Sequence, residues 1–152
     1  MRKVFLLFAL FIGILGTVSA QSTTKELFTA VLKNKPADVE TLLANGADPN
    51  GTVEMIPGFP TNCLIIAAGN NRLEIVKTLV QHKAQVNQTD NFKATALMAA
   101  AGKGNKEIVE FLLANGADVK VKDEDGKDAL AAAKESGNAQ VIMLIEQKLK
   151  AS

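Results

Sequence analysis

The sequence repeats itself with a period of 33 residues. Leu64 recurs as Leu97 and again as Leu130, each one period apart. The tetrapeptide at 45–48 (NGAD) returns at 115–118, which is two periods and four residues later. A unit of this length cannot bury its apolar side chains alone, so consecutive units have to stack and share one core. The period therefore predicts an array of stacked repeats.

Each unit is predicted to contain two short helices. In the third unit, small side chains over residues 97–101 indicate a first helix, which residues 103–105 break. Residues 106–114 (KEIVEFLLA) indicate a second helix, and Gly116 closes it because glycine adopts the left-handed conformation without strain. We expect the alanines of the first helices to let neighbouring units approach closely, with larger aliphatic side chains of the second helices filling the space between units.

Four units fit the chain, at about 24–51, 52–88, 89–122 and 123–150. The end units are atypical, because one face of each meets water. Pro36 lies at the start of the second helix of the first unit, and a polar stretch closes the last unit. Four units exceed the minimum of about three that an independently stable stack requires.

Three segments of the third unit resemble an ankyrin repeat: 95–101 (TALMAAA), 104–109 (GNKEIV) and 116–119 (GADV). Ala96 and Met98 stand where the family signature has Pro and His. Asp123 and Gly126 match the family's finger, the solvent-facing hairpin before each first helix, whereas Lys93 takes the Gly position one unit earlier. The resemblance covers about Thr24 to Lys150. It implies an all-α ankyrin-repeat solenoid of about four helix-turn-helix units with short β-hairpin fingers.

The first twenty residues have the pattern of a secretory signal. A basic start is followed by an apolar stretch at 4–16 and by the small residues Val18 and Ala20. The apolar stretch is shorter than the roughly 20 residues that span a bilayer. We predict a signal peptide at 1–20, cleavage after Ala20, and a periplasmic or secreted ankyrin repeat domain at 21–152. A retained N-terminal anchor is the alternative.

The composition excludes several classes of function. With 17 Lys+Arg against 16 Asp+Glu, the formal net charge is +1, which gives no reason to expect a nucleic-acid partner. One Cys and one His exclude a disulfide framework and a closed zinc site. Residues 118–128 superficially resemble a calcium loop but lack the bidentate Glu at its twelfth position. We expect no metal, no cofactor and no catalytic residues.

Cys63 and His82 are the two residues that invite a catalytic interpretation. Cys63 aligns with Ala96 and Ala129, so it is expected to be a small, partly buried hydrophobe. A reactive thiol or an intermolecular disulfide is the alternative. His82 occupies the place before a helix-closing residue, which is normally exposed, so it is expected at the surface. A catalytic role is not favoured, because no partner that would orient it and no nucleophile is readable beside it.

The clearest departure from the period lies in the first finger, residues 51–62 (GTVEMIPGFPTN), which carries four extra residues. A finger needs only polar turn residues, but this one contains Met55, Ile56 and Phe59, stiffened by two prolines. A rigid apolar tip costs little entropy to bind with, and exposed apolar clusters often mark contact sites. The equally weighted alternative is that these side chains fold back over the first unit as a lid.

The resemblance implies a second binding surface, made of finger tips and the exposed faces of first helices, which together line a concave groove. Phe92 stands out there, because a turn tip has no structural need for an aromatic ring and aromatics are favoured interface anchors. Packing of Phe92 on the neighbouring finger is the alternative. Carried over by alignment, this surface comprises Asn70, Asn71, Thr89, Asn91, Phe92, Lys93, Gly102, Lys103, Glu124, Asp125, Lys127, Glu135 and Ser136.

These observations favour a non-catalytic protein–protein interaction module, monomeric and without a membrane partner once the signal is removed. The resemblance also extends to exported bacterial ankyrin proteins linked to immunity against toxins or to protection from oxidative stress. A host-directed secreted effector differs from these in destination only. An enzyme or redox carrier that uses Cys63 is the least favoured hypothesis. The identity of the protein partner is not readable from the sequence.

Overall fold

The computed structural model describes residues 22–151, so the predicted signal segment lies outside the described residues. No helix in this described range is long and apolar enough to cross a membrane. A helical stretch at 22–32 is followed by α2 (Pro36–Ala44), β1 (Thr52–Ile56), β2 (Phe59–Asn62), α3 (Cys63–Gly69), α4 (Leu73–Gln81), α5 (Ala96–Gly102), α6 (Lys106–Ala114), α7 (Ala129–Ser136) and α8 (Ala139–Ala151).

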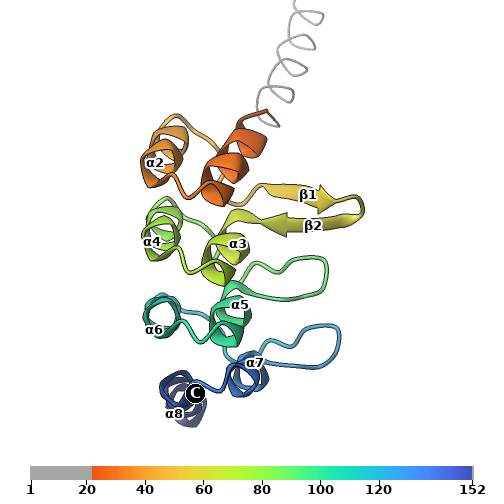
Figure 1. The fold of residues 1–152 in the computed structure, drawn as a ribbon, viewed down its shortest axis with the longest axis vertical. Helices are drawn as coiled ribbons and strands as arrows, with labels where there is room; N and C mark the ends of the chain where they lie inside the picture. Colours follow the sequence, from red (N-terminus) through yellow and green to blue (C-terminus); the bar gives the residue numbers. More distant parts are fainter. Residues whose placement is uncertain (1–21, 152) are drawn as a thin grey trace, which may run out of the picture.

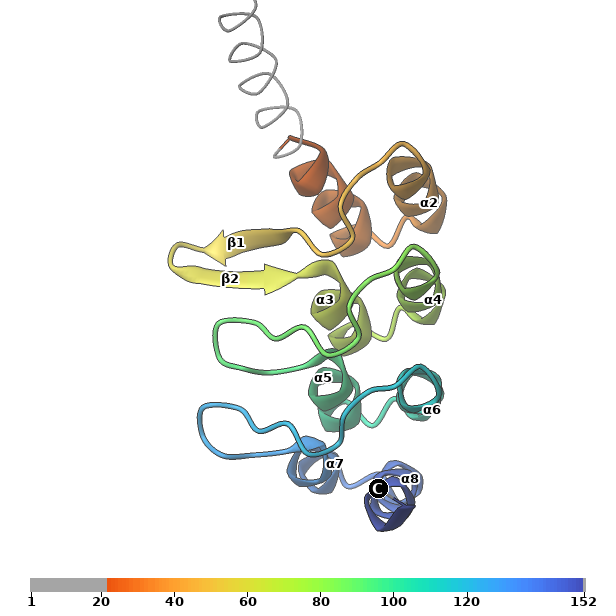
Figure 2. The same ribbon diagram turned by 180° about the vertical axis from the view of Figure 1, so that it is seen from behind.

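The helices form two parallel stacks, and the fingers project from one of them (Figure 1). Residues 22–32, α3, α5 and α7 make the first stack, with α3 packed on α5 and α5 on α7. The second stack contains α2, α4, α6 and α8, each packed on the next. Figure 2 shows the same arrangement from behind, with all fingers on the side away from the second stack. Every unit therefore contacts only its neighbours, as the period predicts.

Each first helix behind a finger begins with a side-chain cap, and the caps follow the period. The side chain of Asn62 accepts a hydrogen bond from the Ile65 N–H (3.0 Å). Thr95 and Asp128 cap α5 and α7 in the same way, at 3.3 Å and 2.9 Å. A capping side chain satisfies one of the backbone donors that a helix start leaves unpaired. These three residues therefore set where α3, α5 and α7 begin.

Small residues separate neighbouring first helices. A Cβ added to Gly69 would lie 3.6 Å from the Cβ of Ala99, and one added to Gly102 would lie 3.8 Å from that of Ala132. The larger apolar side chains fill the space between the two stacks. The fully buried ones are Leu27, Val31, Val39, Ile75, Val76, Leu79, Leu97, Ile108, Val109, Leu112, Val141 and Ile145. The expected close approach of the first helices is confirmed, but the large buried side chains come from both stacks, because Leu27, Val31 and Leu97 belong to first helices.

The second helices end in the left-handed conformation. The backbone has φ of 86° at Gly116, where the sequence predicts this geometry. Lys83 occupies the equivalent place one period earlier and has φ of 71°, although it carries a Cβ. Glycine adopts this region without strain, whereas a Cβ clashes there. The left-handed conformation of Lys83 at the end of α4 therefore costs conformational free energy, which Gly116 at the end of α6 avoids.

Asparagine side chains tie consecutive units together at these helix ends. The side chain of Asn50 accepts from the Gln85 N–H (2.7 Å) and donates to the Lys83 carbonyl (3.3 Å). Asn87 repeats both bonds one unit later, accepting from the Asp118 N–H at 2.8 Å and donating to the Gly116 carbonyl at 3.0 Å. Each asparagine thereby fixes the distance between two units.

The fingers differ from one another more than the sequence predicts. Between residues 22 and 151, β1 and β2 of the first finger are the only strands. The later fingers are loops closed by two backbone bonds each. In the second finger, the Asp90 N–H donates to the Ala94 carbonyl (3.0 Å) and the Lys93 N–H to the Asp90 carbonyl (3.1 Å); in the third, the Asp123 N–H donates to the Lys127 carbonyl (2.9 Å) and the Gly126 N–H to the Asp123 carbonyl (3.1 Å). The prediction of β-hairpin fingers is therefore right for the first finger and wrong for the later two, which lack the four extra residues that lengthen the ladder.

Candidate functional site

The first finger is a regular hairpin that ends in a tight turn. β1 and β2 pair antiparallel from Thr52 opposite Asn62 to Ile56 opposite Phe59, with one irregularity beyond Glu54. Gly58 takes a φ of 84° in the turn, and its N–H donates to the Glu54 carboxylate at 3.1 Å. The turn is thus held by a side chain of the hairpin itself, which makes the tip a defined surface.

The tip of the first finger is exposed. Met55 retains 55% of its accessible surface, Ile56 63% and Phe59 41%, whereas Val53 at the base of the finger packs against the core. The alternative in which these side chains form a buried lid over the first unit is therefore wrong. We call Met55, Ile56, Phe59 and Phe92 the apolar tip. Its role in binding stays a prediction.

Phe92 belongs to this surface because its ring stacks on that of Phe59. The ring centroids are 5.2 Å apart and the planes differ by 14°. The interpretation that Phe92 packs on the neighbouring finger is confirmed, yet the residue remains 48% exposed. A stacked aromatic pair of this kind adds about 0.5–1.5 kcal/mol beyond the area it buries. The pair therefore joins two fingers and still presents both rings to solvent.

The backbone also links the fingers in order. The Asn91 N–H donates to the Pro60 carbonyl (3.2 Å), and the Glu124 N–H donates to the Phe92 carbonyl (3.0 Å). Each finger therefore rests on the one before it through a bond that involves no side chain. This ladder places the finger tips in one row along the array (Figure 1).

A groove of about 350 Å³ lies between the second and third fingers and the helices behind them. Its apolar part comes from Met98, Ala99 and Ala132, which belong to α5 and α7. Its polar lining residues are Lys103, Asp123, Asp125, Lys127, Asp128 and Glu135. Small apolar side chains surrounded by charges on a concave surface suit a partner side chain with an apolar stem and a polar end.

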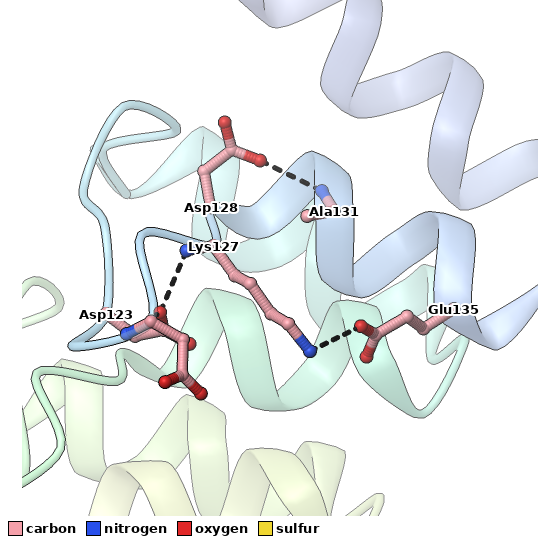
Figure 3. Close-up of polar contacts among 6 residues, drawn as sticks. Asp123, Lys127, Asp128, Ala131 and Glu135 are labelled. Carbon is pink, nitrogen blue, oxygen red and sulfur yellow. Dashed lines mark hydrogen bonds and ion pairs between the residues drawn. The ribbon is translucent and has the colours of Figure 1, made fainter.

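Charged side chains at this groove hold one another in place (Figure 3). Lys127 Nζ lies 2.7 Å from Glu135 Oε1. This hydrogen bond and the charge of Glu135 raise the pKa of Lys127, and the charges of Asp125 and Asp123 add to the rise. Asp123 also accepts from the Lys127 N–H at 2.8 Å, so the loop carrying Lys127 is fixed. The groove lining thus carries four carboxylates against two lysines.

The predicted site residues fall into four groups, of which three lie on the fingers and in the groove. Lys103, Asp125, Lys127 and Glu135 line the groove together with Gly102, whereas Phe59 and Phe92 lie at the apolar tip with Met55 and Ile56. Thr89, Asn91, Lys93 and Glu124 are exposed on the second and third fingers outside the groove lining.

The remaining three predicted residues serve the fold. Asn70 donates through its side chain to the Ile66 carbonyl (2.9 Å) and ends α3, and Asn71 follows it with φ of 56°. Ser136 donates to the Ala133 carbonyl at 2.6 Å and accepts from the Asn138 N–H at 3.2 Å. Local bonds of this kind account for asparagine and serine at helix ends without any ligand.

Six of the residues that line the groove are not among the predicted site residues: Ala94, Met98, Ala99, Asp123, Asp128 and Ala132. Met98 is buried at the position where the resembled family has His, and only its departure from that pattern marks it. Asp123 was assigned to the finger turn and Asp128 was left out, although its spacing of 33 from Thr95 identifies it as a cap. A residue that caps a helix can therefore also line a surface.

Cys63 and His82, the two residues with a catalytic alternative, both have surroundings that serve the fold. Cys63 is fully buried at the start of α3, and burial raises the pKa of its thiol to about 12, with the charge of Asp48 adding to the rise. A thiol in this state carries almost no thiolate at neutral pH, and the thiolate is the reactive form. His82 lies at the surface, where its side chain is partly buried and its Nε2 is 3.1 Å from Glu40 Oε1 of α2.

The acidic residues that superficially suggested a calcium loop serve the backbone. Asp118 accepts from the Lys120 N–H at 2.8 Å, and Asp123 accepts from the Asp125 N–H at 3.0 Å. Nowhere in the described range do three or more His, Cys, Asp or Glu side chains gather in a way that could hold a metal ion. The carboxylates of this segment shape loops.

A comparison with protein families matches residues 27–123 to a family described as ankyrin repeats in three copies. The match covers more than half of the chain. It ends before α7 and α8, which continue the two stacks beyond it as a further helix pair (Figure 1). The chain therefore belongs to the ankyrin repeat family.

Proposed function

We propose that this chain is an exported, non-catalytic scaffold, an ankyrin-repeat solenoid of about four units, that binds one protein through its finger tips and concave face. Ankyrin repeats are generally protein–protein interaction modules, and the family is generally non-catalytic. The burial of Cys63 and the raised pKa of its thiol argue in the same direction, against an enzyme or redox carrier.

The exposed aromatic pair of Phe59 and Phe92 is the observation that carries the proposal. Both rings are about half exposed, although the buried core does not need them. Aromatic residues dominate interface hot spots because they are large, rigid and gain most from losing water. Their stacking fixes both rings before a partner arrives, which lowers the entropy cost of binding.

The groove between the second and third fingers supports a contact that extends along the row of fingers. Protein interfaces combine an apolar centre with a polar rim. The apolar tip supplies such a centre, and the charged side chains of Asp125, Lys127 and Glu135 supply polar contacts beside it. A partner that covers both the apolar tip and the groove would make apolar contacts at the tip and charged contacts at the groove.

Export follows from the signal-like pattern of residues 1–20, with the mature protein in the periplasm or in the medium. An immunity protein, an oxidative-stress accessory protein and a host-directed effector are specific forms of this proposal, and they differ in partner and destination. Fractionation of the producing cells into cytoplasm, periplasm and medium tests the export step. A full-length product retained in the cytoplasm would contradict it.

Affinity capture with a matched pair of baits tests the binding function. Bait made of residues 21–152 contains every described element and four stacked units, more than the minimum of about three for a stable array. The double variant Phe59→Ala/Phe92→Ala is the test bait. Met143→Ala is the control, because this residue is an apolar side chain of α8 that is 54% exposed and lies outside the fingers.

We expect one protein from the extract of the producing organism to bind the unaltered bait and the Met143→Ala bait, and to be lost from the double variant. Purified components should then reproduce the difference by calorimetry. Capture of the same proteins by all three baits, or no specific capture, would contradict binding through the apolar tip.

A further inference from the structure

The first finger stands at the open end of the finger ladder. Each later finger donates one backbone N–H to the finger before it, from Asn91 to Pro60 and from Glu124 to Phe92. β1 is the incoming strand of the first finger, and residues 22–51 before it form no finger (Figure 1). Neighbouring fingers are joined in this way twice inside the chain, and no finger precedes β1 to accept the corresponding bond from it.

The period identifies the donor that belongs to this place. Asn91 and Glu124 are 33 residues apart, and Glu54 precedes Asn91 by 37, which is one period plus the four extra residues of the first finger. The same step of 37 separates Asn50 from Asn87, two residues that make identical contacts with the next unit. Glu54 N–H is thus the counterpart of the two donors that already hold a neighbouring finger.

The pairing of the hairpin turns this N–H away from β2. In the later fingers, the bonded pairs are Asp90 with Ala94 and Asp123 with Lys127, and their counterparts in the first finger are Val53 and Thr61. Bonded and non-bonded pairs alternate along an antiparallel ladder, so the next pair, Glu54 opposite Pro60, is non-bonded. Pro60 has no N–H to offer in any case. The backbone N–H and C=O of Glu54 therefore face outward.

A cavity lies along this outer edge. It measures about 550 Å³, is lined by Thr24 and Lys25 on one side and by residues 51–54 of the hairpin on the other, and extends across the hairpin to Pro60 of β2. Gly51 sets its width at the base, because a Cβ there would lie 2.6 Å from Thr24 Cγ2. Of the features that usually protect a sheet edge, the β1 sequence TVEMI lacks lysine and proline but has the charge of Glu54 and the irregularity between Glu54 and Ile56, so the edge is open only up to Glu54.

We propose that the outer edge of β1 takes up an extended segment of the partner protein, paired antiparallel to β1, with a backbone carbonyl accepting the Glu54 N–H. The proposal rests on the proposed function and names the form of the partner. Addition of a strand to a sheet edge draws its affinity from backbone bonds and its specificity from alternate side chains. The segment continues an interface that the chain already builds twice between its own fingers.

The first of the two junctions indicates the side chain that the partner presents; at the second, the acceptor Phe92 lies 32 residues after Pro60, so only the donors follow the period. Inside the chain, Phe59 precedes the accepting Pro60 and stacks on Phe92, which follows the donor Asn91. The counterpart of Phe92 beside β1 is Met55, which follows Glu54 and is 55% exposed. An aromatic residue immediately before the accepting carbonyl would lie on Met55, and thioether–aromatic contacts are favourable. The partner segment is therefore extended and carries an aromatic residue at this position.

A peptide with the sequence of residues 57–62 (PGFPTN), blocked at both ends, is the probe, because this segment supplies both the carbonyl and the ring inside the chain. Amide NMR of residues 21–152 follows the titration. We expect the peptide to shift the Glu54 and Met55 amides and to slow solvent exchange at Glu54, with no comparable change at Asn91. Replacing the aromatic residue of the peptide by alanine should weaken binding roughly tenfold.

Two variants of Glu54 separate the backbone donor from the side chain. Glu54→Pro removes the outward N–H and leaves the bonds of Val53 intact, since proline is tolerated where a strand N–H faces solvent. Both variants lose the carboxylate that accepts from the Gly58 N–H, and Glu54→Ala keeps the Glu54 N–H, so it is the matched control. We expect Glu54→Pro to bind the peptide about tenfold or more weakly than Glu54→Ala does. If Glu54→Pro misfolds, Met55→Lys serves as the test in its place, because it leaves the hairpin backbone untouched. It should abolish peptide binding.

Three results would overturn the proposal: no shift at Glu54 at millimolar peptide, equal binding by Glu54→Pro and Glu54→Ala, or a Glu54 amide already protected in a dimer seen by sedimentation. The last would mean that a second copy of the chain occupies the edge. A captured partner that is lost from Phe59→Ala/Phe92→Ala but kept by Glu54→Pro would leave the proposed function standing and this inference wrong. Failure of the unaltered chain to capture any partner would instead count against the proposed function.

Discussion

Phe59 and Phe92 stack ring on ring at 5.2 Å although they are one full period apart in the sequence. Counted back from the helix that follows each finger, they lie at matching positions of two consecutive fingers, and the third finger has Asp125 at that position. The row of equivalent positions thus changes from aromatic to acidic along the array. A partner lying across the fingers would meet an apolar surface at one end and a negative charge at the other.

The first prediction concerns the stability of this pair. Phe92→Ala should lower the free energy of unfolding by about 1–3 kcal/mol, because it loses the stacking contact with Phe59 and the burial of about half of the side chain. Leu97→Ala in the buried core should cost about 2–5 kcal/mol. Urea unfolding followed by circular dichroism measures both. Equal losses in the two variants would place Phe92 in the core and weaken its assignment to a binding surface.

The second prediction tests the periodic caps. Thr95→Ala removes the side chain that accepts from the Met98 N–H, so it should destabilise the array by about 1 kcal/mol. Thr95→Ser keeps the hydroxyl and is the matched control, expected to retain most of the stability. A Thr95→Ala variant as stable as Thr95→Ser would mean that packing alone determines where α5 begins.

The third prediction concerns the pH dependence that Cys63 confers. Its thiol has an ordinary pKa of 9.0 when exposed and about 12 when folded, so the folded state holds this proton more tightly. The stabilising contribution is complete below pH 9 and is lost as the pH rises from about 9 to about 12.

Cys63→Ala should reduce the fall in stability over this alkaline range, and alanine suits the place because Ala96 and Ala129 occupy the equivalent positions. Urea midpoints measured for both proteins between pH 7 and 11 provide the comparison. The native thiol should also resist alkylation at pH 8 until urea unfolds the chain. Rapid alkylation of the native protein would revive a reactive role for Cys63.

The fourth prediction tests the close approach that frames the edge of β1. Gly51→Ala should destabilise the array by about 1–3 kcal/mol, because its Cβ would lie 2.6 Å from Thr24 Cγ2. Thr24→Ser removes that methyl group and keeps the hydroxyl, so the double variant should recover part of the loss. A double-mutant cycle from thermal unfolding gives the coupling between the two sites. Additive losses would mean that Gly51 is needed for a reason other than its contact with Thr24.

The period and the local helix patterns were sufficient to predict most of the helical architecture. Residues 106–114 form α6 as predicted, and the alanines of α5 lie between neighbouring first helices. These features depend on contacts within a few residues or on a repeat that is visible at many positions, so a single sequence contains them. The family follows from the same repeat.

The geometry of the candidate site depended on the tertiary structure. The sequence left open whether Met55, Ile56 and Phe59 form a lid or a tip, and whether Phe92 contacts its neighbour. It also could not place Lys127 Nζ at 2.7 Å from Glu135 Oε1. Such contacts join residues of different elements, and they depend on hairpin register and on the spacing between units.

The sequence by itself determined the repeat, the helices and the chemistry of the finger tips, because these are local or periodic properties. Only the tertiary structure decided that the tip of the first finger points into solvent, that His82 meets Glu40, and that the Glu54 N–H faces outward. The physical reason is that a side chain or a backbone donor acquires its direction from the partner it packs against. That partner lies in another unit or across a hairpin, where the linear pattern of residues does not specify the distance.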